Sequence, residues 1–123
     1  MKRKANSKSE DLSRVILYLD DIEQIFGLLK DNCEKVSAGG KGYELERPTE
    51  IDEYKNLGKE QFDTLEINGL EPYVSVTISQ SPLFGGVTVR VGKDDPKSLG
   101  LFTAITDIIK KRQNKFALFY KSL

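Results

Sequence analysis

The sequence predicts an α+β fold, a two-layer sandwich in which a mostly antiparallel sheet of about four strands packs against an N-terminal and a C-terminal helix. Apolar residues recur at three- and four-residue steps near both ends of the chain, which is the period of an amphipathic helix. Between these regions, short segments alternate apolar and polar residues, as strands with one buried face do. At 123 residues, the chain suits one domain with a single core.

The most regular helical pattern follows a polar N-terminal segment. Residues 1–9 carry four basic residues and few apolar ones, so we expect this segment to be mobile. The main domain is predicted over residues 10–112, and its first helix over residues 10–34 with Ser9 as N-cap. The apolar stripe of this helix comprises Leu12, Val15, Ile16, Leu19, Ile22, Phe26 and Leu29.

The segment after this helix, "SAGGKG", is rich in glycine and is predicted to be a connection. A phosphate-binding loop has a similar composition, but it follows a strand and opens a helix, and here the predicted order is reversed. The next segment, "GYELER", alternates as a short strand over residues 42–47. A small helix is predicted over residues 50–57, with Thr49 as its cap and Gly58 as its end.

Three further strands are predicted between residues 62 and 91. The first, "FDTLEI", is expected to end at Asn68-Gly69, a strong turn signal. The next two, "YVSVTIS" and "VTVRV", should form a hairpin over residues 73–91. Their aliphatic positions predict a buried face, and the positions between them carry hydroxyl groups and Arg90. We expect this polar face to be solvated or covered by something outside the chain.

The last helix has a well-defined start. Asp95 at the N-cap and Pro96 at the first helical position both favour helix initiation. The apolar stripe that follows is expected to lie on the valine face of the sheet. It comprises Leu101, Phe102, Ile105, Ile108 and Ile109.

The composition limits the chemistry of the chain. There is no histidine, and Cys33 is the only cysteine, which excludes an internal disulfide and a cysteine-rich zinc site. Asp20, Asp21 and Glu23 are magnesium candidates, but they border the predicted apolar stripe, where solvated acids are common. We therefore expect no catalytic residue, metal, cofactor or small-molecule substrate. Among the alternative functions of the chain, a small enzyme with carboxylate-based chemistry ranks second, after nucleic-acid binding.

The formal net charge is zero, but the charges are segregated. Residues 10–71 carry sixteen acidic and seven basic residues, whereas residues 110–123 carry five basic residues and no acidic one. Basic termini favour anionic partners, and a nucleic-acid-binding module that uses them is the first alternative. The expected outer sheet face carries hydroxyl groups rather than stacking aromatic rings, and the acidic middle repels phosphate, so nucleic acid is the less favoured partner.

The C-terminal sequence "DIIKKRQNKFALFYKSL" contains the candidate contact site. Its helical period continues past Lys115, so the last helix either extends or restarts in the basic and aromatic extension at residues 113–123. The aromatic side chains either pack on the first helix or settle at a membrane interface, where the bases attract anionic lipid. The candidate contact residues are Lys110, Lys111, Arg112, Lys115, Phe116, Phe119 and Tyr120.

Three segments, "LYLDDIEQIFGLL", "EPYVSVTIS" and "DDPKSLGLFTAITDII", resemble uncharacterised bacterial α+β domains that precede transmembrane helices in longer proteins. This resemblance implies a cytoplasmic sensor, scaffold or interaction domain whose chain continues into a membrane span. No stretch of the sequence approaches the roughly 18 apolar residues of such a span. We expect a non-enzymatic interaction or regulatory domain in the cytoplasm, at the inner face of a membrane, which contacts anionic lipid, a protein partner or a second copy of itself.

Overall fold

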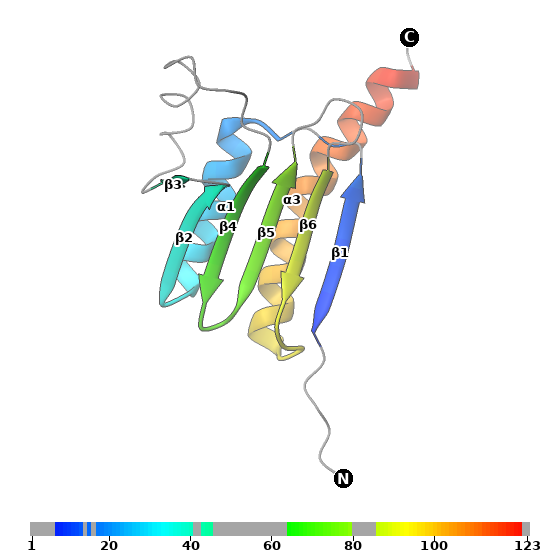
Figure 1. Cartoon of the computed structure of the whole chain (residues 1–123). Helices are drawn as coiled ribbons and strands as arrows, with labels where there is room; N and C mark the ends of the chain where they lie inside the picture. Colours follow the sequence, from blue (N-terminus) through cyan, green and yellow to red (C-terminus); the bar gives the residue numbers. More distant parts are fainter. Residues whose placement is uncertain are drawn as a thin grey trace.

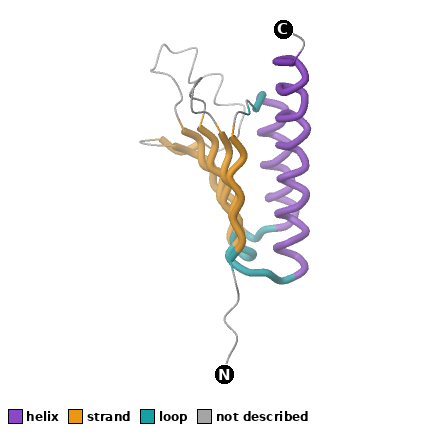
Figure 2. Tube along the Cα trace, turned by 90° about the vertical axis from the view of Figure 1, so that its right-hand side faces the viewer, coloured by secondary structure: helices purple, strands orange, loops and turns teal. Residues whose placement is uncertain are grey.

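The computed structural model confirms the α+β two-layer sandwich and describes residues 7–13, 15, 17–40, 43–45, 64–79 and 86–121. In chain order its elements are β1 (Lys8–Ser13), α1 (Leu19–Asn32), β2 (Lys35–Gly40), β3 (Tyr43–Leu45), β4 (Thr64–Leu70), β5 (Val74–Ser79), β6 (Gly86–Val91) and α3 (Pro96–Lys121). The strands form one six-stranded antiparallel sheet in the order β1-β6-β5-β4-β2-β3 (Figure 1). Both helices lie on the same face of this sheet (Figure 2). The sheet has more strands than the sequence predicts.

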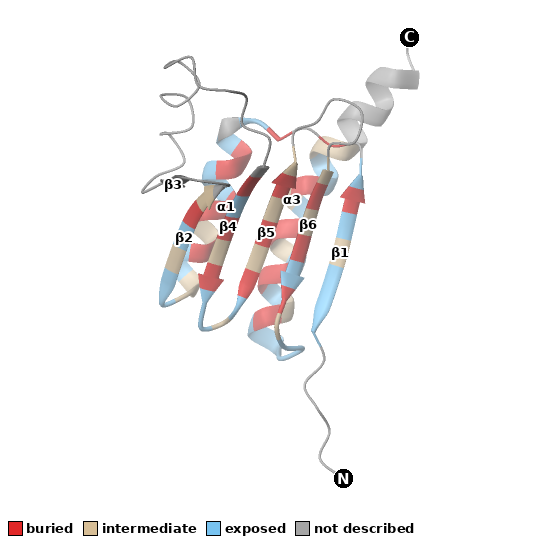
Figure 3. Ribbon diagram, in the orientation of Figure 1, coloured by how far each residue is buried: buried red, intermediate tan, exposed pale blue. Residues whose placement is uncertain are grey.

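The β5–β6 hairpin is confirmed, and it supplies the centre of the core. Directly opposed residues of an antiparallel pair lie on the same face. The register sets Val76 against Val89 and Ile78 against Val87, and all four are buried. Leu65 and Ile67 of β4 continue this apolar face (Figure 3).

The prediction of one long helix from residue 10 is wrong. Residues 8–13 form β1, an edge strand that pairs with β6, and α1 begins at Leu19 with Tyr18 as its N-cap in place of Ser9. The register places Lys8 and Glu10 on the core side beside buried Leu12. Charged residues at these two inward positions hide the alternation of the strand, and the next apolar residues happen to follow at helical spacing.

Two turn predictions are also wrong. Residues 37–40 of the glycine-rich segment after α1 belong to strand β2 (Lys35–Gly40) rather than to a connection, and β2 pairs with both β3 and β4. Asn68 and Gly69 lie inside β4, and the turn comes later, at residues 71–73. At Gly69, an added Cβ would approach the Cys33 sulfur to 2.6 Å, so a larger residue there would force the Cys33 side chain, at the end of α1, to move.

The predicted short strand is confirmed as β3, whereas the predicted helix over residues 50–57 lies outside the described residues. The start of α3 is confirmed as well. The Asp95 carboxylate accepts a hydrogen bond from the Ser98 backbone N–H at 2.8 Å, which lowers the pKa of Asp95. The predicted stripe of α3 faces the sheet, since Leu101, Phe102, Ile105 and Ile109 are buried and Ile108 is partly buried.

The helix α3 is longer than the sheet on which it packs. Its 26 residues span about 39 Å, whereas the six residues of β5 span about 20 Å. Its C-terminal turns therefore extend beyond the end of the strands (Figures 1 and 2). The helix is continuous through residue 121, which confirms that it extends past Lys115 instead of restarting.

The assignment of the two sheet faces predicts unequal effects of neighbouring substitutions in β4. Ile67 is fully buried, so Ile67→Ala should lower the free energy of unfolding by about 2–5 kcal/mol. Glu66, the preceding residue, lies on the exposed face, so Glu66→Ala should change it by less than about 0.5 kcal/mol. Urea denaturation followed by circular dichroism measures both. Equal losses for the two variants would contradict the assignment.

Candidate interaction surfaces

The predicted C-terminal contact residues fall into three groups: those paired with an acidic side chain, one that is exposed, and those whose side chains are not described. Lys110 forms an ion pair with Glu10 of β1, with 3.4 Å between its Nζ and the glutamate Oε1. Lys111 is exposed, and Arg112 is turned toward α1. The remaining four residues lie on the last turns of α3, where the side chains lie outside the described part of the chain; they are Lys115, Phe116, Phe119 and Tyr120.

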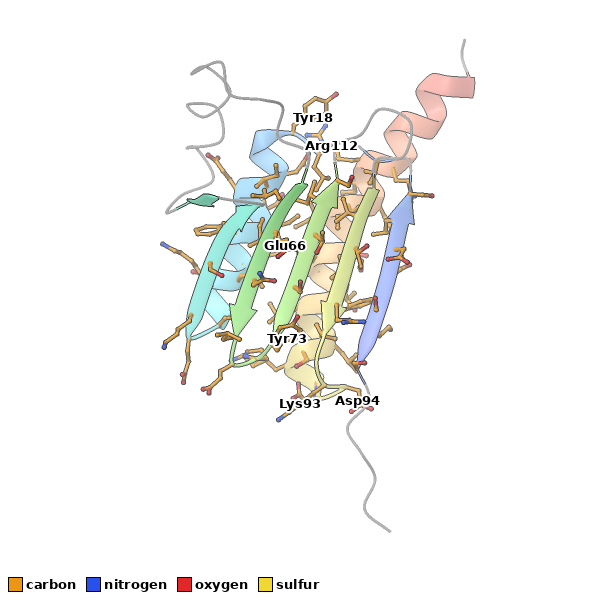
Figure 4. All side chains as sticks on the ribbon, in the orientation of Figure 1. Tyr18, Glu66, Tyr73, Lys93, Asp94 and Arg112 are labelled. Atoms are coloured by element: carbon orange, nitrogen blue, oxygen red, sulfur yellow. The ribbon has the colours of Figure 1, made fainter. Side chains whose placement is uncertain are left out.

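Arg112 joins α3 to the start of α1. Its Nε donates a hydrogen bond to Asp21 Oδ2 at 2.7 Å, and its Nη2 donates to Asp20 Oδ2 at 3.2 Å. The same Asp21 oxygen accepts a hydrogen bond from the Tyr18 backbone N–H at 3.0 Å. The guanidinium also lies over the Tyr18 ring, 4.9 Å from its centroid (Figure 4). The hydrogen bond to Asp21 raises the pKa of Arg112 above its already high ordinary value, so the group stays charged.

This contact gives Asp20 and Asp21 a structural explanation. Asp21 is buried, and its carboxylate is satisfied by the helix start and by Arg112. A buried carboxylate needs a partner of this kind, because desolvation of an unpaired charge is costly. Within the described ranges, no group of three or more metal-ligating side chains lies together. The two aspartates thus hold α1 against α3.

The second surface is the sheet face that α1 and α3 leave uncovered, which we call the open face. The strand register arranges its residues in rows across the sheet. One row runs Ser37, Asn68, Ser75, Arg90 and Ser9, and the next runs Gly39, Glu66, Thr77, Thr88 and Asp11. Small hydroxyl-bearing residues and glycine therefore make up most of the face.

Among the described side chains, four exposed charged residues stand on the open face, and they are separated by sign along the strands. Lys35 and Arg90 lie toward the end that carries the β4–β5 turn, whereas Glu66 and Asp11 lie toward the other end. Asp11 accepts a hydrogen bond from the Thr88 hydroxyl at 2.8 Å. In the part of the chain that the structure describes, Arg90 forms no ion pair.

Large side chains on the open face gather at the end with the basic residues. Leu70 and Tyr73 flank the turn residues Glu71 and Pro72, and they remain 50% and 43% exposed. Tyr73 packs against Gly92, where an added Cβ would lie 3.2 Å from the ring. Figure 4 shows Tyr73 near this end of the sheet and Glu66 nearer the opposite end.

The only cysteine lies behind this turn. The Cys33 thiol donates a hydrogen bond to the Pro72 carbonyl at 3.4 Å, and burial raises its pKa. A raised pKa leaves less of the nucleophilic thiolate, although the nearby positive charge of Lys97 offsets part of the effect of burial. The next residue, Glu34, donates its backbone N–H to the carbonyls of Leu70 and Glu71 at 3.0 and 3.3 Å.

Comparisons of the chain with models of protein families, with curated proteins and with solved structures find no match. Sequence reasoning identified the polar positions of β5 and β6. It missed that β1 adds Asp11 to the open face and that α1 binds Arg112, because it treated residues 10–34 as one helix.

The contact between α1 and α3 predicts a stabilising role for Asp21. Asp21→Ala removes the acceptor shared by Tyr18 and Arg112, and it should lower the free energy of unfolding by about 1–3 kcal/mol. Glu23→Ala, at an exposed position of the same helix, is the matched control and should change it by less than about 0.5 kcal/mol. Thermal and urea unfolding measure the difference. An Asp21→Ala variant as stable as the Glu23→Ala variant would show that the contact does not hold the helices together.

The neighbouring carboxyls of Glu34 and Glu71 predict a dependence of stability on pH. A hydrogen bond with Glu71, and then repulsion by its charge, raises the pKa of Glu34 above its ordinary value of 4.5. The stability that this pair contributes is present below the ordinary pKa and is lost as the pH rises through the raised one. Glu34→Gln should therefore melt at a higher temperature than the native chain at neutral pH.

Melting curves recorded from acidic to neutral pH provide the test. The difference between Glu34→Gln and the native chain should shrink as the pH falls. Glu23→Gln makes the same change of net charge at a site away from this pair. A pH profile of Glu34→Gln that parallels that of the native chain would contradict the assignment.

Proposed function

We propose that this protein is a non-enzymatic interaction domain that works at the inner face of a membrane as part of a larger membrane-anchored protein, and that the C-terminal turns of α3 make the contact. The observation that carries the proposal is the extension of α3 beyond the sheet. A basic and aromatic sequence on such an extension has no strand beneath it. Lysine near an anionic leaflet and aromatic rings at the interface are an established combination for surface binding.

The contacts of the described side chains support a role without catalysis. Of the acidic residues considered as metal ligands, Asp20 and Asp21 hold Arg112, and Asp95 caps α3. Cys33 is partly buried and donates its hydrogen to a backbone carbonyl. Each group therefore has a structural task that accounts for its position.

The structure narrows the residues available for a membrane contact. Arg112 and Lys110 are engaged with acidic side chains of α1 and β1, so neutralising them would disturb the fold as well as any binding. Lys111 is exposed and pairs with no described side chain. A test of membrane binding should therefore change Lys111 and Lys115 and keep Arg112. No helix in the described part of the chain is long and apolar enough to cross a bilayer.

Vesicle co-sedimentation tests the proposal. The native chain should bind vesicles of phosphatidylserine and phosphatidylcholine, and this binding should weaken as the salt concentration is raised. It should not bind vesicles of phosphatidylcholine alone. The double variant Lys111→Glu, Lys115→Glu should bind about tenfold more weakly or worse, because each basic residue near the surface contributes about 1 kcal/mol. A chain ending at Asn114 should also lose binding.

Two controls separate this effect from net charge. Lys97→Glu changes an exposed lysine in the first turn of the same helix, and Arg90→Glu changes an exposed arginine on the open face. Combined in one chain, they change the net charge by as much as the double variant does. Both should bind vesicles like the native chain. Equal binding by all variants, or no binding by any, would rule out the proposed contact. A salt-sensitive shift with random RNA or DNA that depends on the same lysines would favour the nucleic-acid alternative.

A further inference from the structure

The open face has the pattern of a surface that is complementary to itself. Of the charged side chains that the structure describes on it, the basic Lys35 and Arg90 lie toward one end of the strands and the acidic Asp11 and Glu66 toward the other. All four side chains are exposed. We propose that this face binds a second copy of the chain, sheet against sheet, through a two-fold axis that runs across the strands.

The positions of the charges select this orientation. Neighbouring strands are about 4.8 Å apart, and residues two apart on one strand are separated by about 6.6 Å. An axis across the strands, midway between the Arg90 row and the Asp11 row, brings these two rows over each other. Arg90 then lies one strand spacing, about 4.8 Å sideways, from Asp11 of the second copy. Lys35 lies about 8 Å sideways from Glu66 of the second copy, within reach of its long side chain.

The other face-to-face orientation fails on charge. An axis parallel to the strands places each row over the same row of the second copy. Glu66 then approaches Asp11 of the second copy, and Arg90 approaches Lys35 of the second copy. Like charges brought together at an interface are strongly unfavourable. The charge pattern therefore distinguishes one arrangement from the other, which an unpatterned polar face could not do.

The shape of the face agrees with the same orientation. Leu70 and Tyr73 project at the end with the β4–β5 turn. The opposite end carries Ser79 and Gly86, which are directly paired in the register. The axis across the strands places Tyr73 of each copy over Ser79 of the other, with Leu70 one strand spacing to the side. Serine, threonine and glycine between them allow two sheets to approach to the usual distance of about 10 Å.

The size of the face sets the expected strength of the complex. Five strands across and six residues along give a footprint of about 24 by 20 Å, or roughly 500 Å² on each copy. This is near the lower end of specific interfaces, where transient complexes are found. Self-association should therefore depend on concentration and weaken with salt.

Sedimentation equilibrium of the full chain over a range of concentrations tests the proposal. The native chain should form a dimer that weakens at high salt. Arg90→Glu and Asp11→Arg should each weaken it by more than about tenfold, because each change brings two pairs of like charges together. Mixing these two variants restores both opposite pairs in the mixed dimer, so the mixture should associate as the native chain does. Circular dichroism checks that each variant is folded.

Lys111→Glu, at an exposed position in the helical layer, is the matched control and should leave the dimer unchanged. A native chain that stays monomeric at every concentration would overturn the proposal. So would a dimer that Arg90→Glu leaves intact, or a mixture of the two charge variants that fails to associate. Vesicle binding uses a different surface, so either proposal can fail while the other holds.

Discussion

The structure depends on the burial of one aliphatic face of the sheet. The central strands turn valine, isoleucine and leucine to the same side, and α1 and α3 place their own aliphatic stripes against it. Burial of such surface is the main favourable contribution to folding. Because both helices are needed on this side, the other face stays open. Because α3 is longer than the strands, part of it also stays beyond the sheet.

Sequence reasoning succeeded where one signal dominated. The alternation in β5 and β6 is complete, and Asp95 with Pro96 marks the start of α3. It failed where an edge position weakened the signal. Lys8 and Glu10 of β1 face inward at the rim, where Lys8 lies 4.8 Å from the Phe102 ring centroid and Glu10 pairs with Lys110. No period in the sequence reveals that two charged residues are satisfied by a helix that follows about a hundred residues later.

The candidate surfaces were predictable to different degrees. Segregation of charge along the chain drew attention to the basic C-terminal helix. The sequence could not show that the acidic middle and the basic end meet, as Arg112 does with Asp20 and Asp21. Part of the segregated charge is thus used to hold α1 on α3. The sign pattern on the open face depends on the strand order, which brings Asp11 from the start of the chain beside Thr88.

The pairing of β1 with β6 also bears on the rate at which the chain folds. Strand β1 is the first described element to be synthesised, but its neighbour in the sheet follows more than seventy residues later, as the hydrogen bond between Asp11 and Thr88 spans 77 positions. Contacts between distant parts of a chain slow folding, because a large loop must close before they form. A newly synthesised β1 therefore has no partner strand until β6 has followed it. The inward charges of Lys8 and Glu10, which obscure the strand in the sequence, also disfavour pairing of this edge with the strand of another chain.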